Sequence, residues 1–155
     1  MSEQTKRPRV VLVDDHPAVL HQVKELVSRH FEVVATLGDG RQLLALAAHE
    51  HIDLIVLDIT LPELSGIQIA PLLKESGCSA RIVFLTVHAD ADYVREGFEA
   101  GGLGYVLKPR IASDLLPAIK AALKGAPFIS PSPELKEVAE ELTRHLEKKP
   151  GSNGK

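Results

Sequence analysis

The sequence predicts an α/β protein built on an open, doubly wound parallel sheet, and three observations support this fold class. Short runs rich in Val, Ile and Leu recur along the chain, each of strand length. Segments with apolar residues at a spacing near 3.6 separate these runs, which is the pattern of amphipathic helices. Strand and helix alternate strictly, and this order requires a parallel sheet with right-handed crossovers and helices on both faces.

The five apolar runs show little alternation between polar and apolar residues. A strand that is covered on both faces has this pattern, because every side chain meets a hydrophobic layer. We therefore expect five buried strands, at residues 9–13, 32–36, 53–57, 81–85 and 104–107. The common order for five doubly wound strands is 2-1-3-4-5, the flavodoxin-like arrangement, with its switch point between strands 1 and 3.

The five expected helices follow the strands one by one, and each has an apolar stripe on one face. In chain order the stripes consist of Val19, Leu20, Val23, Leu26 and Val27; Leu43, Leu44 and Ala47; Ile67, Ile69, Leu72 and Leu73; Val94, Phe98 and Ala100; and Leu115, Leu116, Ile119, Ala122 and Leu123. Each strand is thus followed by a helix that can cover the sheet.

Composition excludes several functional classes. The chain has 155 residues, of which 45% are hydrophobic and 25% charged, values typical of a globular protein with one main domain. A net charge of −3 gives no basic footprint for direct nucleic-acid binding. The single cysteine, Cys78, excludes an internal disulfide framework. Because no signal peptide and no apolar run of about 20 residues is visible, we expect a cytoplasmic location without membrane contact.

Polar side chains stand where four of the strands end. Asp14 and Asp15 follow the first strand, Asp58 follows the third, Thr86 the fourth and Lys108 the fifth. The carboxyl ends of parallel strands form the ligand-binding edge of an open sheet. We therefore expect these side chains to meet in one crevice.

Three carboxylates in one crevice repel one another and raise each other's pKa unless a cation compensates. Oxygen ligands favour Mg²⁺, with Mn²⁺ as an alternative, over zinc. A carboxylate can then act as the nucleophile toward a phosphoryl group, which gives an aspartyl phosphate. Lys108 can neutralise a phosphoryl oxygen, and the Thr86 hydroxyl can donate a hydrogen bond to another.

On these residues the chain resembles the receiver domain of two-component response regulators, over about residues 8–126. The stretches at 13–17, 61–66 and 100–109 are most similar to the subfamily whose receivers usually precede a LuxR-type helix-turn-helix. The resemblance implies a phosphorylation-dependent switch that receives its phosphoryl group from a histidine kinase or a phosphotransfer protein. It also implies that the only catalysis is self-phosphorylation and slow self-dephosphorylation, with a changed protein contact, such as a homodimer, as the output.

The resemblance also assigns roles to individual residues. Asp58 would be the phosphoacceptor, and Asp15 a direct ligand of Mg²⁺. Asp14 would hold the ion through water, and the backbone carbonyl of Thr60 would complete the protein ligands. Lys108 would neutralise the phosphoryl group. Thr86 and Tyr105 would form the switch pair, the two residues that respond to phosphorylation. A cis peptide bond before Pro109 is implied as well.

Other interpretations of the same residues stay open. An aspartate before Pro17 is also a common helix cap, and Lys108 alone could be a solvated surface residue. A pseudo-receiver, which binds partners without phosphorylation, is a second function class. A haloacid-dehalogenase-type phosphatase is a third, although its nucleophile ends the first strand and a second aspartate follows two residues later. Here Thr60 stands two residues after Asp58.

The C-terminal part of the sequence departs from the strand-helix pattern. Residues 127–133 are expected to form a proline-rich linker, residues 134–148 an amphipathic helix and residues 149–155 a flexible tail. The helix stripe, formed by Leu135, Val138, Ala139, Leu142 and Leu146, must pack on the receiver, on a partner or on a second copy. Ser132 is the expected cap of this helix. A helix-turn-helix needs roughly 50 to 60 more residues, so the sequence predicts a stand-alone or shortened receiver.

Overall fold

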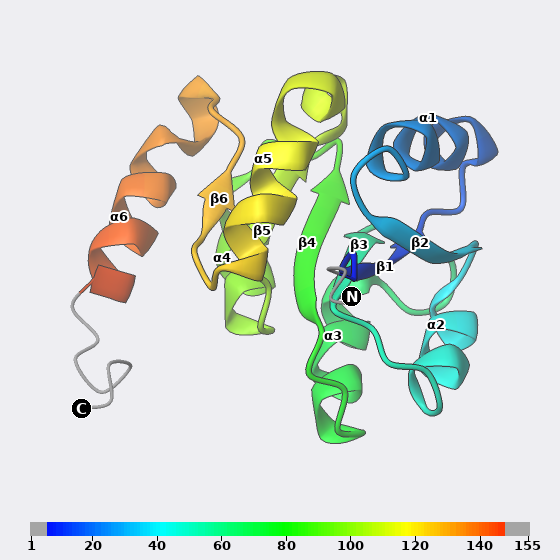
Figure 1. The fold of residues 1–155 in the computed structure, drawn as a ribbon. Coiled ribbons are helices and arrows are strands. Elements are labelled where there is room, and N and C mark those ends of the chain that lie inside the picture. The colour runs from blue at the N-terminus through cyan, green and yellow to red at the C-terminus, as the bar shows by residue number, and fades with distance from the viewer. Residues whose placement is uncertain (1–5, 148–155) are drawn as a thin grey trace.

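Six parallel strands form one sheet in the computed structural model, in the order β2-β1-β3-β4-β5-β6 (Figure 1). The structure describes residues 6–147. The strands are β1 (Arg9–Val13), β2 (Glu32–Leu37), β3 (Leu54–Asp58), β4 (Arg81–Thr86), β5 (Gly104–Leu107) and β6 (Phe128–Ile129). The predicted order of the first five strands is confirmed, and a sixth strand is added at the edge.

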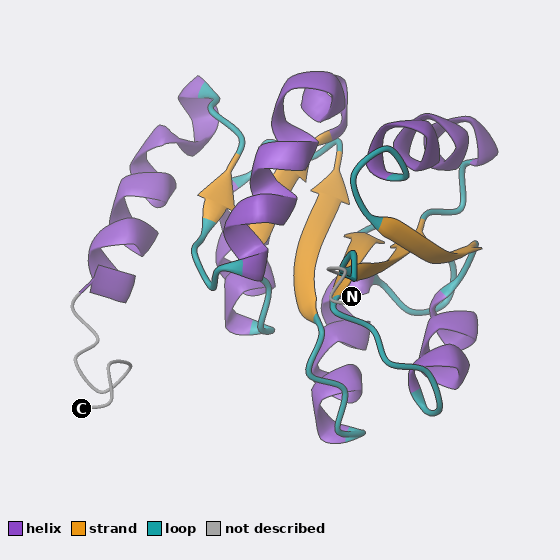
Figure 2. Cartoon of the chain, in the orientation of Figure 1, coloured by secondary structure: helices purple, strands orange, loops and turns teal. Residues whose placement is uncertain are grey.

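Helices cover both faces of this sheet (Figure 2). They are α1 (Pro17–Val27), α2 (Gly40–Ala47), α3 (Gly66–Glu75), α4 (Ala91–Glu99), α5 (Ile111–Leu123) and α6 (Lys136–Glu147). One core layer contains Leu43 of α2, Ile69 of α3 and Val94 of α4, whereas the other contains Val23 of α1 and Leu115 of α5. The fold is therefore the predicted doubly wound, flavodoxin-like arrangement. Within residues 6–147, no helix is both long and apolar enough to span a bilayer.

One of the five strands expected to be buried is not. Every residue of β3 is buried, but β2 lies at the edge of the sheet and its residues are half-buried or exposed. An edge strand has only one neighbouring strand, so it is covered less completely than the central ones. The prediction of a fully buried β2 is therefore wrong, although its position and pairing with β1 are as expected.

Helix α3 begins close to the end of β3, and its start is specified locally. Ser65 accepts a hydrogen bond from the Gln68 amide (3.1 Å), and the Gln68 side chain accepts one from the Ser65 amide (2.9 Å), which is a capping box. Gly66 follows, and a Cβ atom there would lie 2.5 Å from the backbone oxygen of Asp58. The close approach of α3 to the phosphoacceptor candidate therefore depends on glycine.

The C-terminal segment belongs to the folded body. Residues 128–129, expected in a linker, form β6 parallel to β5. The next helix begins with a 3₁₀ turn, η2 (Pro133–Leu135), and Ser132 makes no side-chain cap. Leu135 and Val138 of this segment are buried in the core layer of α2, α3 and α4, and Arg95 of α4 pairs with Glu141 (3.1 Å). Of the three surfaces on which the stripe could pack, the receiver is the one that Leu135, Val138 and Leu142 contact. The side chain of Leu146 and residues 148–155 lie outside the described part of the chain.

Candidate functional site

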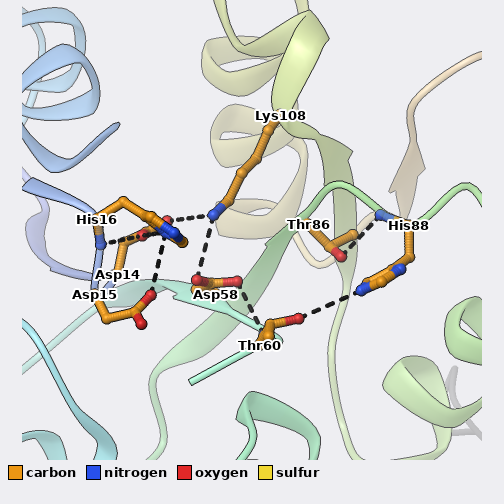
Figure 3. Close-up of polar contacts among 8 residues, drawn as sticks. All are labelled: Asp14, Asp15, His16, Asp58, Thr60, Thr86, His88 and Lys108. Carbon is orange, nitrogen blue, oxygen red and sulfur yellow. Dashed lines mark hydrogen bonds and ion pairs between the residues drawn. The ribbon is translucent and has the colours of Figure 1, made fainter. Parts of the chain in front are cut away.

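Of the polar side chains predicted at the strand ends, Asp14, Asp15, Asp58 and Lys108 come together at the carboxyl edge of the sheet (Figure 3). Thr86 lies at the same edge but is bound to the His88 amide. Ligand atoms of Asp14, Asp15, His16 and Asp58 all lie within 4.8 Å of one another. Asp58 ends β3 and the acidic pair follows β1, and these two strands are neighbours in the sheet. The site therefore lies at the switch point of the strand order, as the fold predicts.

Asp58 is the most enclosed carboxylate of the cluster, with 1% of its surface exposed. Its Oδ1 accepts a hydrogen bond from the Thr60 amide (3.0 Å), and its Oδ2 accepts one from Lys108 Nζ (3.3 Å). Burial, together with the charge of Asp14, raises the pKa of Asp58 to about 6, against the lowering effect of the Thr60 amide and Lys108. Asp58 is therefore largely ionised above neutral pH, but at a cost in free energy.

Lys108 is the cation of the site. Its Nζ lies 2.9 Å from Asp14 Oδ2 as well as 3.3 Å from Asp58 Oδ2. Burial alone would lower the pKa of this ammonium group, but the hydrogen bonds and charges of Asp14 and Asp58 outweigh burial and raise it. No peptide bond within residues 6–147 is cis, so the implied cis bond before Pro109 is wrong. The lysine points into the crevice with a trans bond.

The two carboxylate oxygens of Asp14 have different partners. Its Oδ1 accepts a hydrogen bond from the His16 amide (2.8 Å), and its buried Oδ2 has Lys108 Nζ as an ion-pair partner at 2.9 Å. His16, and neither aspartate, occupies the N-cap position of α1, and no side chain caps the helix. The capping interpretation of the acidic pair is therefore not supported.

Thr86 and Tyr105 both contact the backbone of His88. The Thr86 Oγ1 accepts a hydrogen bond from the His88 amide (3.1 Å), and the Tyr105 hydroxyl donates one to the His88 carbonyl oxygen (2.7 Å). Both side chains are buried, and burial raises the pKa of Tyr105. A movement of Thr86 would thus reach Tyr105 through one residue of the loop after β4.

Comparison with known proteins agrees with this geometry. A family model described as response regulator receiver domain matches residues 10–120. The chain belongs to the response regulator receiver family.

The relatives of this receiver are two-component regulators. It is 37% identical to the nitrate/nitrite response regulator protein NarP of Escherichia coli over 124 residues. The aligned region covers 79% of this chain and 58% of NarP. It is 34% identical over 119 residues to the uncharacterized transcriptional regulatory protein YxjL of Bacillus subtilis, covering 76% and 55%. The chain thus spans little more than half the length of these two relatives.

Solved structures support the assignment. A LuxR-family two-component response regulator from Aurantimonas sp. superposes with a TM-score of 0.78 at 32% identity, over 93% of this chain and 100% of that one. The receiver domain of the response regulator DrrB from Thermotoga maritima, in a BeF3-activated form, gives a TM-score of 0.68 at 32% identity, over 77% of this chain and 99% of that one. The receiver is therefore a signalling module of the two-component type.

The acidic cluster of the receiver could hold a divalent cation. Three carboxylates face a single ammonium group within the described residues, because Lys108 is shared between Asp14 and Asp58. Hard carboxylate oxygens are the ligands that Mg²⁺ prefers. The residues present therefore fit the predicted cofactor.

Two residues of the receiver site were not predicted from the sequence. His16 Nδ1 lies 3.1 Å from Asp14 Oδ1 and 3.2 Å from Asp15 Oδ1, although its place after the acidic pair was a visible signal. His88 is half-buried, with its ring 4.8 Å from that of Tyr93 and its Nε2 3.4 Å from Thr60 Oγ1. Sequence spacing carries no signal for the contact between His88 and Thr60, because these residues lie in loops after different strands.

Proposed function

We propose that this receiver accepts a phosphoryl group on Asp58 from a histidine kinase or a phosphotransfer protein, in the cytoplasm, and changes its protein contacts as a result. One observation carries the proposal. Asp58 is a buried carboxylate whose Oδ2 lies 3.3 Å from Lys108 Nζ, and which shares an acidic cluster with Asp14 and Asp15.

The chemistry assigned to Asp58 is nucleophilic substitution at phosphorus. A carboxylate oxygen forms the new P–O bond while the bond from phosphorus to the donor nitrogen breaks, and the electron pair of that bond leaves with the donor histidine. The carboxylate must be ionised to attack, and a pKa of about 6 leaves it mostly ionised at pH 7.5. Lys108 is already placed beside Asp58 Oδ2 and can neutralise the charge that arrives.

Asp14, Asp15, Asp58 and the backbone carbonyl of Thr60 would hold Mg²⁺, or Mn²⁺ in its place. The bound ion supplies positive charge that offsets carboxylate repulsion and the charge of the phosphoryl oxygens. Asp14 and Asp58 orient their oxygens through fixed hydrogen bonds from the His16 and Thr60 amides. The amides therefore restrict both carboxylates before any ligand arrives.

The response to phosphorylation is assigned to Thr86 and Tyr105. A phosphoryl group adds about two negative charges, which attract a hydroxyl donor. If Thr86 moves toward that group, the hydrogen bond from the His88 amide changes, and the Tyr105 hydroxyl is bound to the carbonyl of the same residue. Tyr105 packs in the core layer that also contains Val94 of α4 and Leu135. The side of the receiver formed by α4, β5 and α5, on which β6 and α6 also pack, is therefore the proposed output surface, and a phosphorylation-dependent homodimer is one such output.

The test is phosphorylation by acetyl phosphate in the presence of Mg²⁺. We expect stoichiometric labelling of the wild type, none for Asp58→Ala, and unchanged labelling for Asp92→Ala, whose side chain is exposed on α4. EDTA should abolish labelling of the wild type.

Labelling of Asp58→Ala at the wild-type level would refute the assignment. Partner binding without any labelling of the wild type would favour the pseudo-receiver, and turnover of a generic phosphate ester would favour the phosphatase. The phosphatase has no support from the family match, which describes a receiver.

A further inference from the structure

A buried serine from the C-terminal segment contacts the last residue of β5, immediately before Lys108. Ser130 follows β6 and has no exposed surface. Its amide donates a hydrogen bond to the Tyr105 carbonyl oxygen (2.9 Å), which continues the pairing of β6 with β5. The hydroxyl is therefore held inside the protein next to the end of β5.

The Ser130 hydroxyl takes the place of a missing strand partner. On one side, β5 pairs with β4 as far as Leu107, but on the other side β6 pairs only with Gly104 and Tyr105. The Leu107 amide donates instead to Ser130 Oγ (3.0 Å). A buried amide without a partner is costly, so this contact fixes the last residue of β5.

The same hydroxyl donates a hydrogen bond to a buried carboxylate. Ser130 Oγ donates to Asp114 Oδ2 (2.7 Å), and Asp114 also accepts hydrogen bonds from Arg110 Nε (2.7 Å) and Ser113 Oγ (2.9 Å). Burial alone would raise the pKa of Asp114, but the hydrogen bonds from Arg110, Ser130 and Ser113 outweigh burial and lower it. The carboxylate is thus ionised and fully engaged, which makes the network rigid.

Lys108 lies between the two ends of this network. Its preceding residue, Leu107, is bound to Ser130, and Arg110, two residues later, is bound to Asp114. Residues Lys108–Arg110 form one 3₁₀ turn, η1, and the hydrogen-bond geometry of such a turn is poorer than that of an α-helix. The network therefore holds both sides of the turn from which the lysine reaches Asp58.

We propose that Ser130 and Asp114 are positioning residues that hold Lys108 over Asp58, so that the segment from β6 onward completes the phosphorylation site. The inference rests on the proposed function, since it concerns the same lysine. It also changes the role of residues 127–133, because a segment expected as a linker contributes a hydroxyl that the site needs.

The test is a double-mutant cycle measured by acetyl phosphate labelling at saturating Mg²⁺. Ser130→Ala should slow labelling of Asp58 about tenfold, because small displacements of a charged group from the reacting atoms reduce rates strongly. In a Lys108→Ala background, Ser130→Ala should have no further effect, because the group that it positions is gone. Ser132→Ala is the matched control, since this nearby hydroxyl contacts only Glu134 among the described residues, and its rate should equal that of the wild type.

An unchanged rate in Ser130→Ala would overturn the inference, and so would an equal slowing with and without Lys108, which would indicate general destabilisation. If Ser130→Ala does not fold, Asp114→Asn enters the same cycle with the same expectations. Amide hydrogen exchange of Leu107 gives a reading without a phosphoryl donor: it should accelerate in Ser130→Ala and not in Ser132→Ala. A wild type that is not labelled refutes the proposed function, whereas unchanged exchange at Leu107 refutes the positioning network.

Discussion

Ionised Asp58 destabilises the metal-free receiver, and an uncharged isostere at this position should remove the cost. Burial and the charge of Asp14 raise the pKa of Asp58 from 3.8 to about 6. The folded state therefore binds the proton of this carboxyl more tightly than the unfolded state does. Asp58→Asn keeps an acceptor for the Thr60 amide but carries no charge. We expect this variant to be more stable than the wild type in EDTA at pH 7.5.

The magnitude follows from the shift. About two pKa units correspond to about 3 kcal/mol, which is the most that the substitution can recover. Imperfect packing of the amide reduces the gain, so we expect an increase of about 1 to 3 kcal/mol in the free energy of unfolding. In a protein of this size each kcal/mol changes Tm by about 2 to 4 °C. Asp58→Asn should therefore melt about 2 to 12 °C higher.

The pH dependence has a definite sign. Because the pKa of the folded state is raised, ionisation of Asp58 costs stability as pH rises from about 4 to about 6, and the full cost is present above that window. The difference between Asp58→Asn and the wild type should accordingly shrink toward zero as pH falls to 4. Thermal denaturation in EDTA at several pH values measures it, with Asp92→Asn as a control that should stay within about 0.5 kcal/mol.

Addition of Mg²⁺ should stabilise the wild type more than Asp58→Asn, because a ligand stabilises the state that binds it. An Asp58→Asn variant that melts below the wild type in EDTA at pH 7.5 would refute this account of the site. A difference independent of pH between 4 and 8 would refute it as well.

Three further predictions concern the scaffold. Leu135→Ala should lower the free energy of unfolding, measured by chemical denaturation, by about 2 to 5 kcal/mol, because Leu135 is fully buried. The control Leu72→Ala should cost far less, because the Leu72 side chain is 39% exposed. Gly66→Ala should cost about 1 to 3 kcal/mol and slow phosphorylation, since its Cβ would meet backbone, whereas Gly38→Ala, with nothing within 4 Å, should be neutral in both assays. Tyr105→Phe should cost about 1 to 3 kcal/mol, through an unpaired carbonyl, and should keep acetyl phosphate labelling while weakening any phosphorylation-dependent self-association.

The five-stranded core and the meeting of Asp14, Asp15, Asp58 and Lys108 were predictable for one physical reason. Parallel strands bring their carboxyl ends to a common edge, so polar residues that follow separate strands in the sequence become neighbours in space. Hydrophobic runs of strand length carry that information directly. The half-buried state of β2 was missed because a sequence pattern does not distinguish an edge strand from a central one.

Part of the structure of the C-terminal segment could not be predicted from sequence patterns. Strand β6 has two residues within a proline-rich stretch, too short for any periodicity, and its pairing with β5 depends on tertiary contact. Ser130 was not predicted because a serine in a proline-rich stretch is usually a turn residue. Its importance follows only from the missing strand partner of Leu107 and the nearby carboxylate of Asp114.

The most direct test of the central claim is to find which residue carries the phosphoryl group. After reaction with acetyl phosphate and Mg²⁺, borohydride reduces an aspartyl phosphate to homoserine, which survives proteolysis and can be located by mass spectrometry. We predict homoserine at position 58 alone, and none in samples treated with EDTA. Homoserine at Asp14 or Asp15 with position 58 unmodified would contradict the account.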